Sequence, residues 1–295
     1  MNAVSSVLAT GCELAAVYGL VVLAVVLAFR ICNFADLTLD GSFTLGAAIT
    51  ATTIMSGGSP LTAFAAALIC GALAGTATVL LHTRLGVNRL LAGIITMTML
   101  YSINLRIMGR PNIPLLQETT AFSWLANPNL ATISYVTITL VIACLLWAFL
   151  KTDLGFFLRA AGENPRVIVR KGYTEEMFLL VGIPAANALT AFAGSVAAQN
   201  QGFADAGMGA GLVVASLTAL LLGEGVILPT SVGRMLAAAL AGAFCYQVAV
   251  GIGLRMGINP WDLKLATGLL LVLALFAKQR SASRRQSMAI GSDPL

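Results

Sequence analysis

Long apolar segments separated by short polar stretches make up most of the chain. They cover approximately residues 12–29, 43–56, 61–81, 90–108, 131–150, 176–198, 209–222, 231–254 and 261–277. The alternating ten-residue pattern of a membrane β-barrel strand is absent. Because a backbone in lipid must satisfy its own hydrogen bonds, these segments should be helices. The pattern therefore predicts an all-α, polytopic membrane helix bundle with about nine (8–10) transmembrane helices.

Two of the apolar segments are too short to cross a bilayer as simple helices. The fourteen residues of 43–56 would reach only about 21 Å, against about 30 Å of hydrocarbon. Segment 209–222 has the same length and the same problem. Segment 43–56 can cross only if the polar stretch 33–42 also lies at membrane depth; otherwise it is a partial span. We therefore expect interrupted helices.

A short sequence repeat links these two segments. Phe34-Ala35-Asp36 recurs 169 residues later as Phe203-Ala204-Asp205, and each copy precedes a stretch rich in small residues and then a short apolar span. This predicts a weak internal two-fold repeat. Paired interrupted segments in corresponding halves of a membrane protein are the best sequence indication of a transport site.

Composition and charge set the membrane class and the orientation. The chain is 58% hydrophobic and 10% charged, with mean hydropathy +0.91, whereas soluble domains carry roughly 25% charged residues. Basic residues gather in Lys151 to Lys171 and in the tail from Lys278. Both segments should therefore be cytoplasmic, and counting spans backward gives an outside N-terminus. We predict one transmembrane domain over 1–295: a first half (12–150), a cytoplasmic segment (151–175), a second half (176–277) and a basic cytoplasmic tail (278–295).

Two carboxylates in the stretch FADLTLDGSF are the first candidates for function. Asp36 and Asp40 lie four residues apart, with Thr38 and Ser42 beside them. An aspartate at membrane depth costs about 2.5–3.5 kcal/mol on insertion scales, so both need water, partners or helix termini. One interpretation is structural: Gly41 interrupts the helix, and Asp40 or Ser42 caps a helix that begins near Phe43. The other is that these side chains line a polar path.

A polar stripe follows in the apolar segment Leu90 to Pro114. Thr98, Ser102 and Arg106 lie at i, i+4 and i+8, with Thr96 and Asn104 nearby. Because such a stripe is unfavourable against lipid, we expect it to face the bundle interior. It would either hydrogen-bond neighbouring helices or line a path. The candidate path residues are Asp36, Thr38, Asp40, Ser42, Thr98, Ser102, Asn104 and Asp205.

Two loops are candidates for contacts with partners. In the basic loop, 158–161 is expected to form a short helix that Gly162 ends, before Asn164-Pro165 turns the chain. This is either a docking element or an ordinary solvated loop. The loop Gly109 to Leu130, on the other side of the membrane, is either a linker or a docking surface. The docking surface is favoured by apolar side chains that such a loop would expose to solvent, including Trp124.

Enzymatic and nucleic-acid functions have no support in the sequence. There is no GxxxxGK[ST] loop for ATP, no nucleophile–base pair and no carboxylate dyad, so we expect no catalytic residues. The five cysteines are scattered without a CxxC pair or a His–Cys cluster, so neither a metal site nor a disulfide is expected. Nucleic-acid binding would need a folded basic face with aromatic side chains, and none is present.

Three longer motifs resemble one protein family. These are RICNFADLTLDGSFTLGAA, LAGIITMTMLYSINLRIMGRPNIPLL and LGFFLRAAGENP. They resemble the permease subunits of bacterial ABC importers in the branched-chain amino acid and ribose permease superfamily, and most closely the tryptophan/tyrosine transport permease group. The resemblance covers about the whole chain, from Glu13 to Phe276.

The resemblance implies partners and a location. It implies a dimer of identical permease copies, as is usual in this group, in the bacterial inner (plasma) membrane. The substrate path would lie at the interface between the copies. Two separate cytoplasmic ATPases would use ATP and Mg²⁺, and this chain would bind no cofactor. A periplasmic or lipid-anchored solute-binding protein would deliver an aromatic or branched-chain amino acid or a similar small solute. The ATPases would dock on a coupling helix that maps to Gly155, Leu158, Arg159, Ala160, Gly162, Glu163, Asn164 and Pro165.

A secondary transporter driven by an ion gradient is the alternative. Asp36 and Asp205 would then be ion or proton ligands. This alternative predicts uptake without ATPase subunits, and the GFFLRAAGENP segment favours the importer over it.

Overall fold

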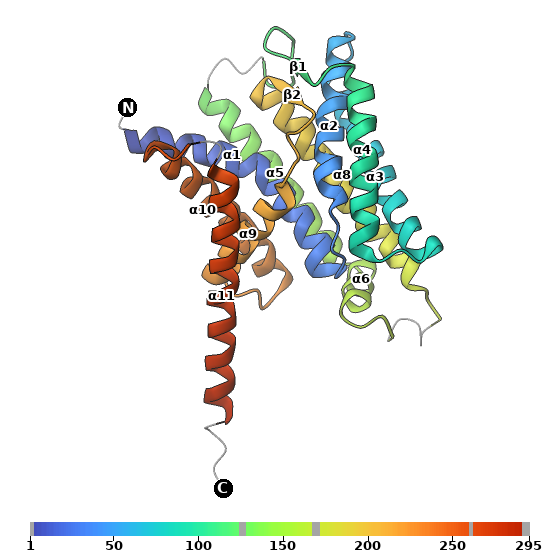
Figure 1. Ribbon diagram of the computed structural model, residues 1–295, viewed down its shortest axis with the longest axis vertical. Coiled ribbons are helices and arrows are strands. Elements are labelled where there is room, and N and C mark those ends of the chain that lie inside the picture. Colours follow the sequence, from blue (N-terminus) through green and yellow to red (C-terminus); the bar gives the residue numbers. More distant parts are fainter. Residues whose placement is uncertain (1–2, 124–127, 167–171, 260–261, 291–295) are drawn as a thin grey trace.

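The protein is described by a computed structural model in which helices dominate (Figure 1). The structure describes residues 3–123, 128–166, 172–259 and 262–290, with side chains from residues 11–123, 130–166, 172–259 and 262–276. Trp124, residues 167–171 of the basic loop and the tail beyond 290 lie outside the described residues. The elements in order are α1 (Ala3–Val25), the π-helix η1 (Val26–Ile31), α2 (Thr38–Met55), α3 (Pro60–Leu85), α4 (Arg89–Met108), β1 (Asn112–Pro114), α5 (Pro128–Lys151), α6 (Asp153–Glu163), α8 (Glu175–Gln201), β2 (Phe203–Asp205), α9 (Leu212–Val226), α10 (Val232–Arg255) and α11 (Leu263–Ile290).

The predicted all-α membrane bundle is confirmed. Six helices of the described part are long and apolar enough to cross a membrane: Gly11–Ile31, α3, α4, Leu130–Lys151, α8 and α10. The apolar helices α9 and Leu263–Phe276 are shorter, and the number of about nine spans stays a prediction. The small antiparallel pair of strands β1 and β2, in which Ile113 lies opposite Ala204, was not predicted.

Helices α2 and α8 form the centre of the bundle. Every residue of α2 from Thr38 to Ala51 is buried, which no single amphipathic face could produce. Glycines set the close approach: a Cβ on Gly46 would lie 1.8 Å from the Ala191 carbonyl oxygen, and one on Gly194 would lie 1.9 Å from the carbonyl oxygen of Phe43. Small residues therefore let α2 and α8 pack backbone against backbone.

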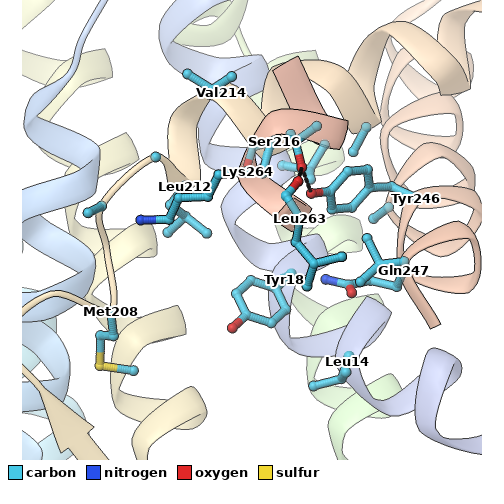
Figure 2. Close-up of a pocket in the computed structure, with 18 of the residues that line it drawn as sticks. Leu14, Tyr18, Met208, Leu212, Val214, Ser216, Tyr246, Gln247, Leu263 and Lys264 are labelled. Atoms are coloured by element: carbon cyan, nitrogen blue, oxygen red, sulfur yellow. Dashed lines mark hydrogen bonds between the residues drawn. The ribbon is translucent and has the colours of Figure 1, made fainter. Parts of the chain in front are cut away.

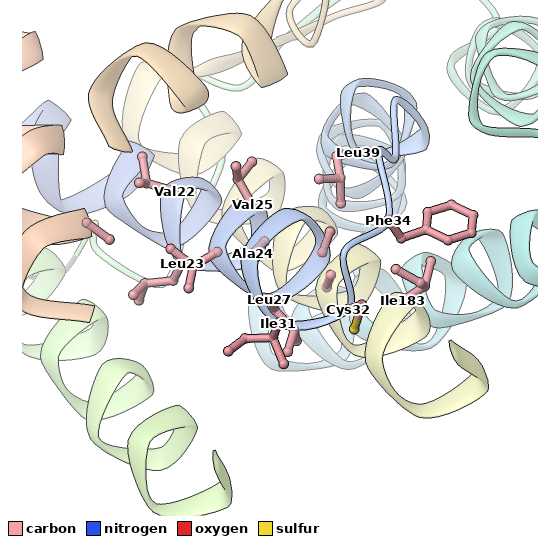
Figure 3. Close-up of a cluster of buried hydrophobic side chains, with 14 of the residues drawn as sticks. Val22, Leu23, Ala24, Val25, Leu27, Ile31, Cys32, Phe34, Leu39 and Ile183 are labelled. Carbon is pink, nitrogen blue, oxygen red and sulfur yellow. The ribbon is translucent and has the colours of Figure 1, made fainter. Parts of the chain in front are cut away.

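The helix break near the first triplet lies earlier than expected. Helix α2 begins at Thr38, with Leu37 as an N-cap that makes no side-chain bond, so Asp40, Gly41 and Ser42 are helical. The prediction that Gly41 interrupts the helix and that a new helix begins near Phe43 is wrong. The break is the non-helical segment 32–37, which follows η1 and includes Asn33 at a positive φ of 49°. Apolar side chains from η1 and its surroundings pack around it (Figure 3).

The second short helix also follows a non-helical segment, as expected for interrupted helices. After β2 the chain makes turns through residues 206–211 before α9 begins at Leu212. The first turns of α2 and α9 lie side by side, where the Val213 N–H donates to Asp40 Oδ1 over 2.7 Å, and the Gly209 N–H just before α9 donates to Thr44 Oγ1 over 3.1 Å. From this point the two helices run toward opposite ends of the molecule (Figure 1). Helix N-termini from the two halves of the chain thus meet inside the bundle.

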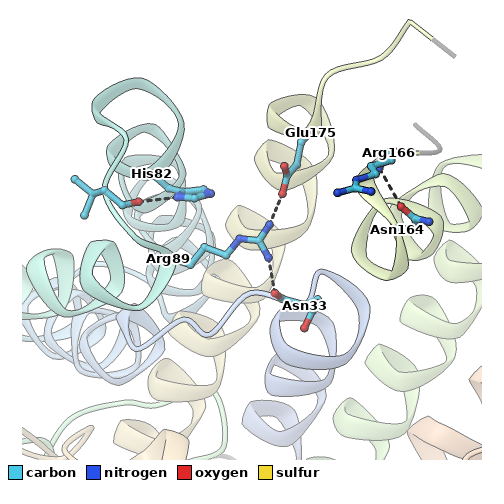
Figure 4. A network of polar contacts seen from close by, with 7 residues as sticks. Asn33, His82, Arg89, Asn164, Arg166 and Glu175 are labelled. Carbon is cyan, nitrogen blue, oxygen red and sulfur yellow. Dashed lines mark hydrogen bonds and ion pairs between the residues drawn. The ribbon is translucent and has the colours of Figure 1, made fainter. Parts of the chain in front are cut away.

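One end of the bundle brings together the turn between α3 and α4, the start of α8 and helix α6. The turn between α3 and α4 lies beside the start of α8, where Arg84 pairs with Glu176 at 2.9 Å and Arg89 pairs with Glu175. Arg89 Nη1 also donates to the carbonyl oxygen of Asn33 over 2.8 Å (Figure 4). Helix α6 lies at this end, and β1–β2 lies at the opposite end (Figure 1). The cytoplasmic assignment of the α6 end remains a prediction.

Candidate functional site

Asp36 caps the helix that follows it. Its side chain is fully buried, and Oδ1 accepts from the Thr38 N–H over 2.8 Å. Oδ2 accepts from Asn187 Nδ2 in α8 over 2.7 Å. The carboxylate therefore satisfies a free N–H and lies at the positive end of the α2 dipole. Gly93 of α4 makes room, because a Cβ there would lie 2.8 Å from the Leu37 nitrogen.

Asp40 caps a different helix from the one predicted. It lies in the first turn of α2 and is 6% exposed. Its Oδ2 accepts from the Gly211 N–H over 2.8 Å, and its Oδ1 accepts from the Val213 N–H over 2.7 Å. These donors belong to the N-terminus of α9, where Gly211 has a positive φ of 84°. The expectation that Asp40 or Ser42 caps its own helix is therefore wrong, because the partner is 171 to 173 residues away.

The polar side chains next to these aspartates bond to other buried groups. Ser42 Oγ donates to Asn187 Oδ1 over 2.7 Å. The hydroxyls of Thr38 and Thr78 lie 2.7 Å apart. Sequence reasoning missed Asn187 and Thr78. Asn187 could have been identified, because an asparagine in the middle of an apolar span is unusual. Thr78 could not, because a threonine in an apolar helix gives no such signal.

The polar stripe of α4 faces outward. Thr98, Ser102 and Arg106 are exposed, so the prediction that they face the interior of this bundle is wrong. Asn104 lies on the other face, is 1% exposed and donates from Nδ2 to the Gly41 carbonyl oxygen over 3.2 Å. One stripe of α4 therefore packs on α2, and no described residue of this chain covers the other stripe.

Asp205 lies apart from the other candidates. It is half-buried in β2, where Oδ1 accepts from the Gly207 N–H over 2.8 Å and Oδ2 accepts from Asn112 Nδ2 over 3.3 Å. The eight candidates therefore do not form one site. Asp36, Thr38, Asp40, Ser42 and Asn104 surround the first turns of α2, Thr98 and Ser102 lie on the outer face of α4, and Asp205 lies at the end of the bundle.

The basic loop contains a longer helix than predicted. Helix α6 begins at Asp153, where Thr152 Oγ1 accepts from the Gly155 N–H over 3.3 Å, and it ends at Glu163. Gly162 therefore lies inside the helix and does not end it. Its place is explained by packing, because a Cβ there would lie 1.9 Å from the Ile31 carbonyl oxygen of η1.

Helix α6 has one buried face and one free face. Gly155, Leu158 and Ala161 are buried, and Arg159, Ala160 and Gly162 are half-buried. Leu154, Phe156, Glu163 and Asn164 are exposed, with Pro165 half-buried beyond the helix. This amphipathic helix, packed on the bundle, replaces the alternative of an ordinary solvated loop.

Comparison with known proteins decides the family. Residues 7–275 match the family model described as "Branched-chain amino acid transport system / permease component". The chain belongs to this permease family. The permease is 34% identical over 273 residues to the "Tyrosine transport system permease protein" of Clostridioides difficile (strain R20291), covering 92% of each chain. It is 33% identical over 279 residues to an uncharacterized protein of Rickettsia prowazekii (strain Madrid E), covering 93% of this chain and 99% of the relative. No solved structure matches significantly.

The family result confirms the resemblance seen in the motifs. The permease is a transport subunit, and its long apolar helices make it a multi-pass membrane protein, consistent with the bacterial inner membrane. Two features of the permease had no sequence prediction. One is the ion pair between Arg30 of η1 and Glu224 of α9, at 2.7 Å. The other is a cavity of about 550 Å³ between α1, α9, α10 and α11 (Figure 2), which none of the eight candidate path residues lines.

Proposed function

We propose that the permease is the transmembrane subunit of an ATP-driven ABC importer. Family membership supports a transport permease, and helix α6 supports the ATP-driven part. An amphipathic helix with Leu154 and Phe156 on its exposed face, at an end of a membrane bundle, offers a docking surface. Two separate cytoplasmic ATPase subunits would bind it and would use ATP and Mg²⁺, since this chain has no phosphate-binding loop.

Direct backbone contact would connect α6 to the centre of the bundle. Gly162 lies against the Ile31 carbonyl of η1, and η1 leads through the break 32–37 to Asp36 and α2. Gly182 of α8 packs on the same break, because a Cβ there would lie 2.2 Å from Cys32 Sγ. A shift of α6 on ATP binding would therefore move the π-helix and the start of α2, since close-packed elements transmit displacement.

We propose that the outer face of α4 lines the substrate path in a permease dimer. A stripe of Thr98, Ser102 and Arg106 facing lipid is unfavourable, but facing a second copy across a hydrated path it is not. The solute would be an aromatic or branched-chain amino acid or a similar small molecule; one relative is named for tyrosine transport. A solute-binding protein would dock at the β1–β2 end, where Leu116 is 83% exposed.

The ATPase contact is tested by Arg159→Glu. Arg159 is half-buried on α6, with its guanidinium carbon 5.8 Å from the Phe156 ring centre. Reversing the charge should abolish ATPase recovery when the tagged permease is purified from its native membrane, while its thermal unfolding changes little. Arg110→Glu at the opposite end is the matched control and should keep the ATPase. Recovery of a wild-type complex with Arg159→Glu would contradict the assignment.

The path assignment is tested by comparing two threonines. Thr98 is exposed, and within the described part of the chain its hydroxyl bonds only to carbonyl oxygens of its own helix, whereas Thr38 is buried against Thr78. Thr98→Val should leave thermal unfolding unchanged and lower ATP-driven uptake several-fold. Thr38→Val should lower the unfolding free energy by about 1 kcal/mol, the value of one hydrogen bond. Wild-type uptake by Thr98→Val in proteoliposomes would exclude a path role for that residue.

The ion-gradient alternative receives no support from the positions of its two ligands. Both carboxylate oxygens of Asp36 accept hydrogen bonds, from Thr38 and from Asn187. The carboxylate of Asp205, in β2, accepts hydrogen bonds from Asn112 and Gly207. The deciding experiment is uptake in proteoliposomes with and without the co-purified ATPase. Uptake that needs the ATPase and ATP supports the importer. Uptake by the permease alone under an ion gradient would replace it with the alternative.

A further inference from the structure

The cavity between α1, α9, α10 and α11 has the size and lining of a ligand site. Its volume of about 550 Å³ falls in the usual range of roughly 300–1,000 Å³ for small-molecule pockets. Apolar side chains form most of the wall, among them Leu14, Val22, Leu212 and Leu263. Tyr18 adds an aromatic face, and its hydroxyl accepts from Gln201 Nε2 over 3.1 Å.

Two buried polar side chains line this cavity without protein partners. Gln247 is 8% exposed and Ser216 is 3% exposed. Neither side chain forms a hydrogen bond with any residue in the described part of the chain. Figure 2 shows Gln247 turned into the space beside Tyr18 and Leu263. Because buried amides and hydroxyls normally have partners, these two side chains are available to bond to a ligand in the cavity.

A cation lies at the same cavity. Lys264, in the first turn of α11, lines it; its side chain is exposed and is in none of the ion pairs found among the described residues. Asp40, whose two oxygens accept N–H groups at the start of α9, forms no ion pair with it within 4 Å, so the ammonium can bind an anionic group of a ligand. The other hydroxyls that line the cavity have partners: Tyr18 accepts from Gln201, and Tyr246 is paired with Thr267 at 2.8 Å.

We propose that this cavity is a binding site for a small amphipathic zwitterion within a single copy of the permease. The carboxylate of the ligand binds Lys264. Its ammonium donates to the amide oxygen of Gln247 and to Ser216, and its apolar or aromatic body packs on Tyr18, Leu212 and Leu263. The site is separate from the path between copies, and its occupation needs neither a second copy nor an ATPase.

Three phenolic probes test this assignment on the full chain alone in nanodiscs. They are radiolabelled L-tyrosine, tyramine without the carboxylate, and 4-hydroxyphenylpropionate without the ammonium. L-Tyrosine should bind saturably, and each analogue should bind at least about tenfold more weakly, as expected for a lost charged or polar contact. Lys264→Met and Gln247→Leu should each weaken L-tyrosine binding about tenfold. Gln117→Leu, on the exposed loop, is the matched control and should bind as wild type.

Several outcomes would overturn the proposal. These are no saturable binding of L-tyrosine, binding that neither cavity variant changes, or equal binding of tyrosine and its deaminated analogue. A lipid that stays in the cavity and does not exchange for L-tyrosine would also overturn it. Thermal unfolding of each variant, compared with Gln117→Leu, separates lost binding from lost folding. Failure of ATP-driven uptake would leave this result untouched, because binding is measured without the ATPase.

Discussion

Replacing Asp40 with leucine should prevent stable folding of the permease. The two N–H groups at the start of α9, on Gly211 and Val213, would lose their carboxylate acceptor inside the bundle. Hydrogen bonds to a charged group contribute about 1.5–3 kcal/mol each, so the unfolding free energy should fall by about 3 kcal/mol or more. Thermal unfolding and size-exclusion chromatography in detergent would measure the loss.

Two matched variants separate the cap from other causes. Asp40→Asn keeps one acceptor oxygen and nearly the same volume, so its loss should be smaller than that of Asp40→Leu. Asp205→Leu makes the same chemical change at the half-buried site in β2 and should cost much less. Normal expression and thermal stability of Asp40→Leu, together with normal uptake, would show that α9 does not depend on this carboxylate.

The sequence located the apolar helices but not the start of α2. The apolar content predicted that this helix begins near residue 43, whereas it begins at Thr38. The missing turn is polar, and it is helical because Asn187 and the α9 N-terminus satisfy its side chains. These partners lie 145 to 173 residues away in the chain. Periodicity carries no information about such distant pairs, so the break could be predicted but not its position.

The orientation of α4 shows a second limit of sequence reasoning. The spacing of Thr98, Ser102 and Arg106 correctly indicated a polar stripe, but the argument against lipid assigned it to the interior of one chain. In the structure Asn104 faces that interior and the stripe faces outward. A polar stripe excludes lipid as its neighbour; it does not say whether the neighbour belongs to the same copy. Under the proposed function that neighbour is a second copy of the permease, which the sequence of one chain does not reveal.

The repeated triplet predicted matching contexts but not matching roles. The first copy lies within the non-helical segment 32–37 just before α2, and the second forms β2, which the turns 206–211 separate from α9. However, Asp36 is fully buried as the cap of α2, whereas Asp205 lies at the end of the bundle. The cap of α9 comes instead from Asp40 in the other half. The two carboxylates in the first half thus stabilise the N-termini of both short helices, which explains why they lie between apolar segments.

A second large effect is expected for Gly162→Val. An added Cβ would lie 1.9 Å from the Ile31 carbonyl oxygen, so α6 or η1 must move. Such overpacking typically destabilises the folded state by about 1–3 kcal/mol. The overpacked contact, between α6 and η1, is the one proposed to transmit the motion of the ATPase. Uptake in proteoliposomes should drop by about tenfold or more, the factor that corresponds to about 1.4 kcal/mol.

Gly225→Val at the end of α9 is the matched control, because a Cβ there meets open space. It should leave uptake and thermal stability near wild type. The informative readout for Gly162→Val is ATP hydrolysis measured beside uptake. Hydrolysis that continues while uptake is lost would show that the ATPase still docks and that the α6–η1 contact carries the coupling. Wild-type uptake per ATP in Gly162→Val would show instead that α6 moves without displacing the π-helix, and the proposed route from Ile31 to Asp36 would be wrong.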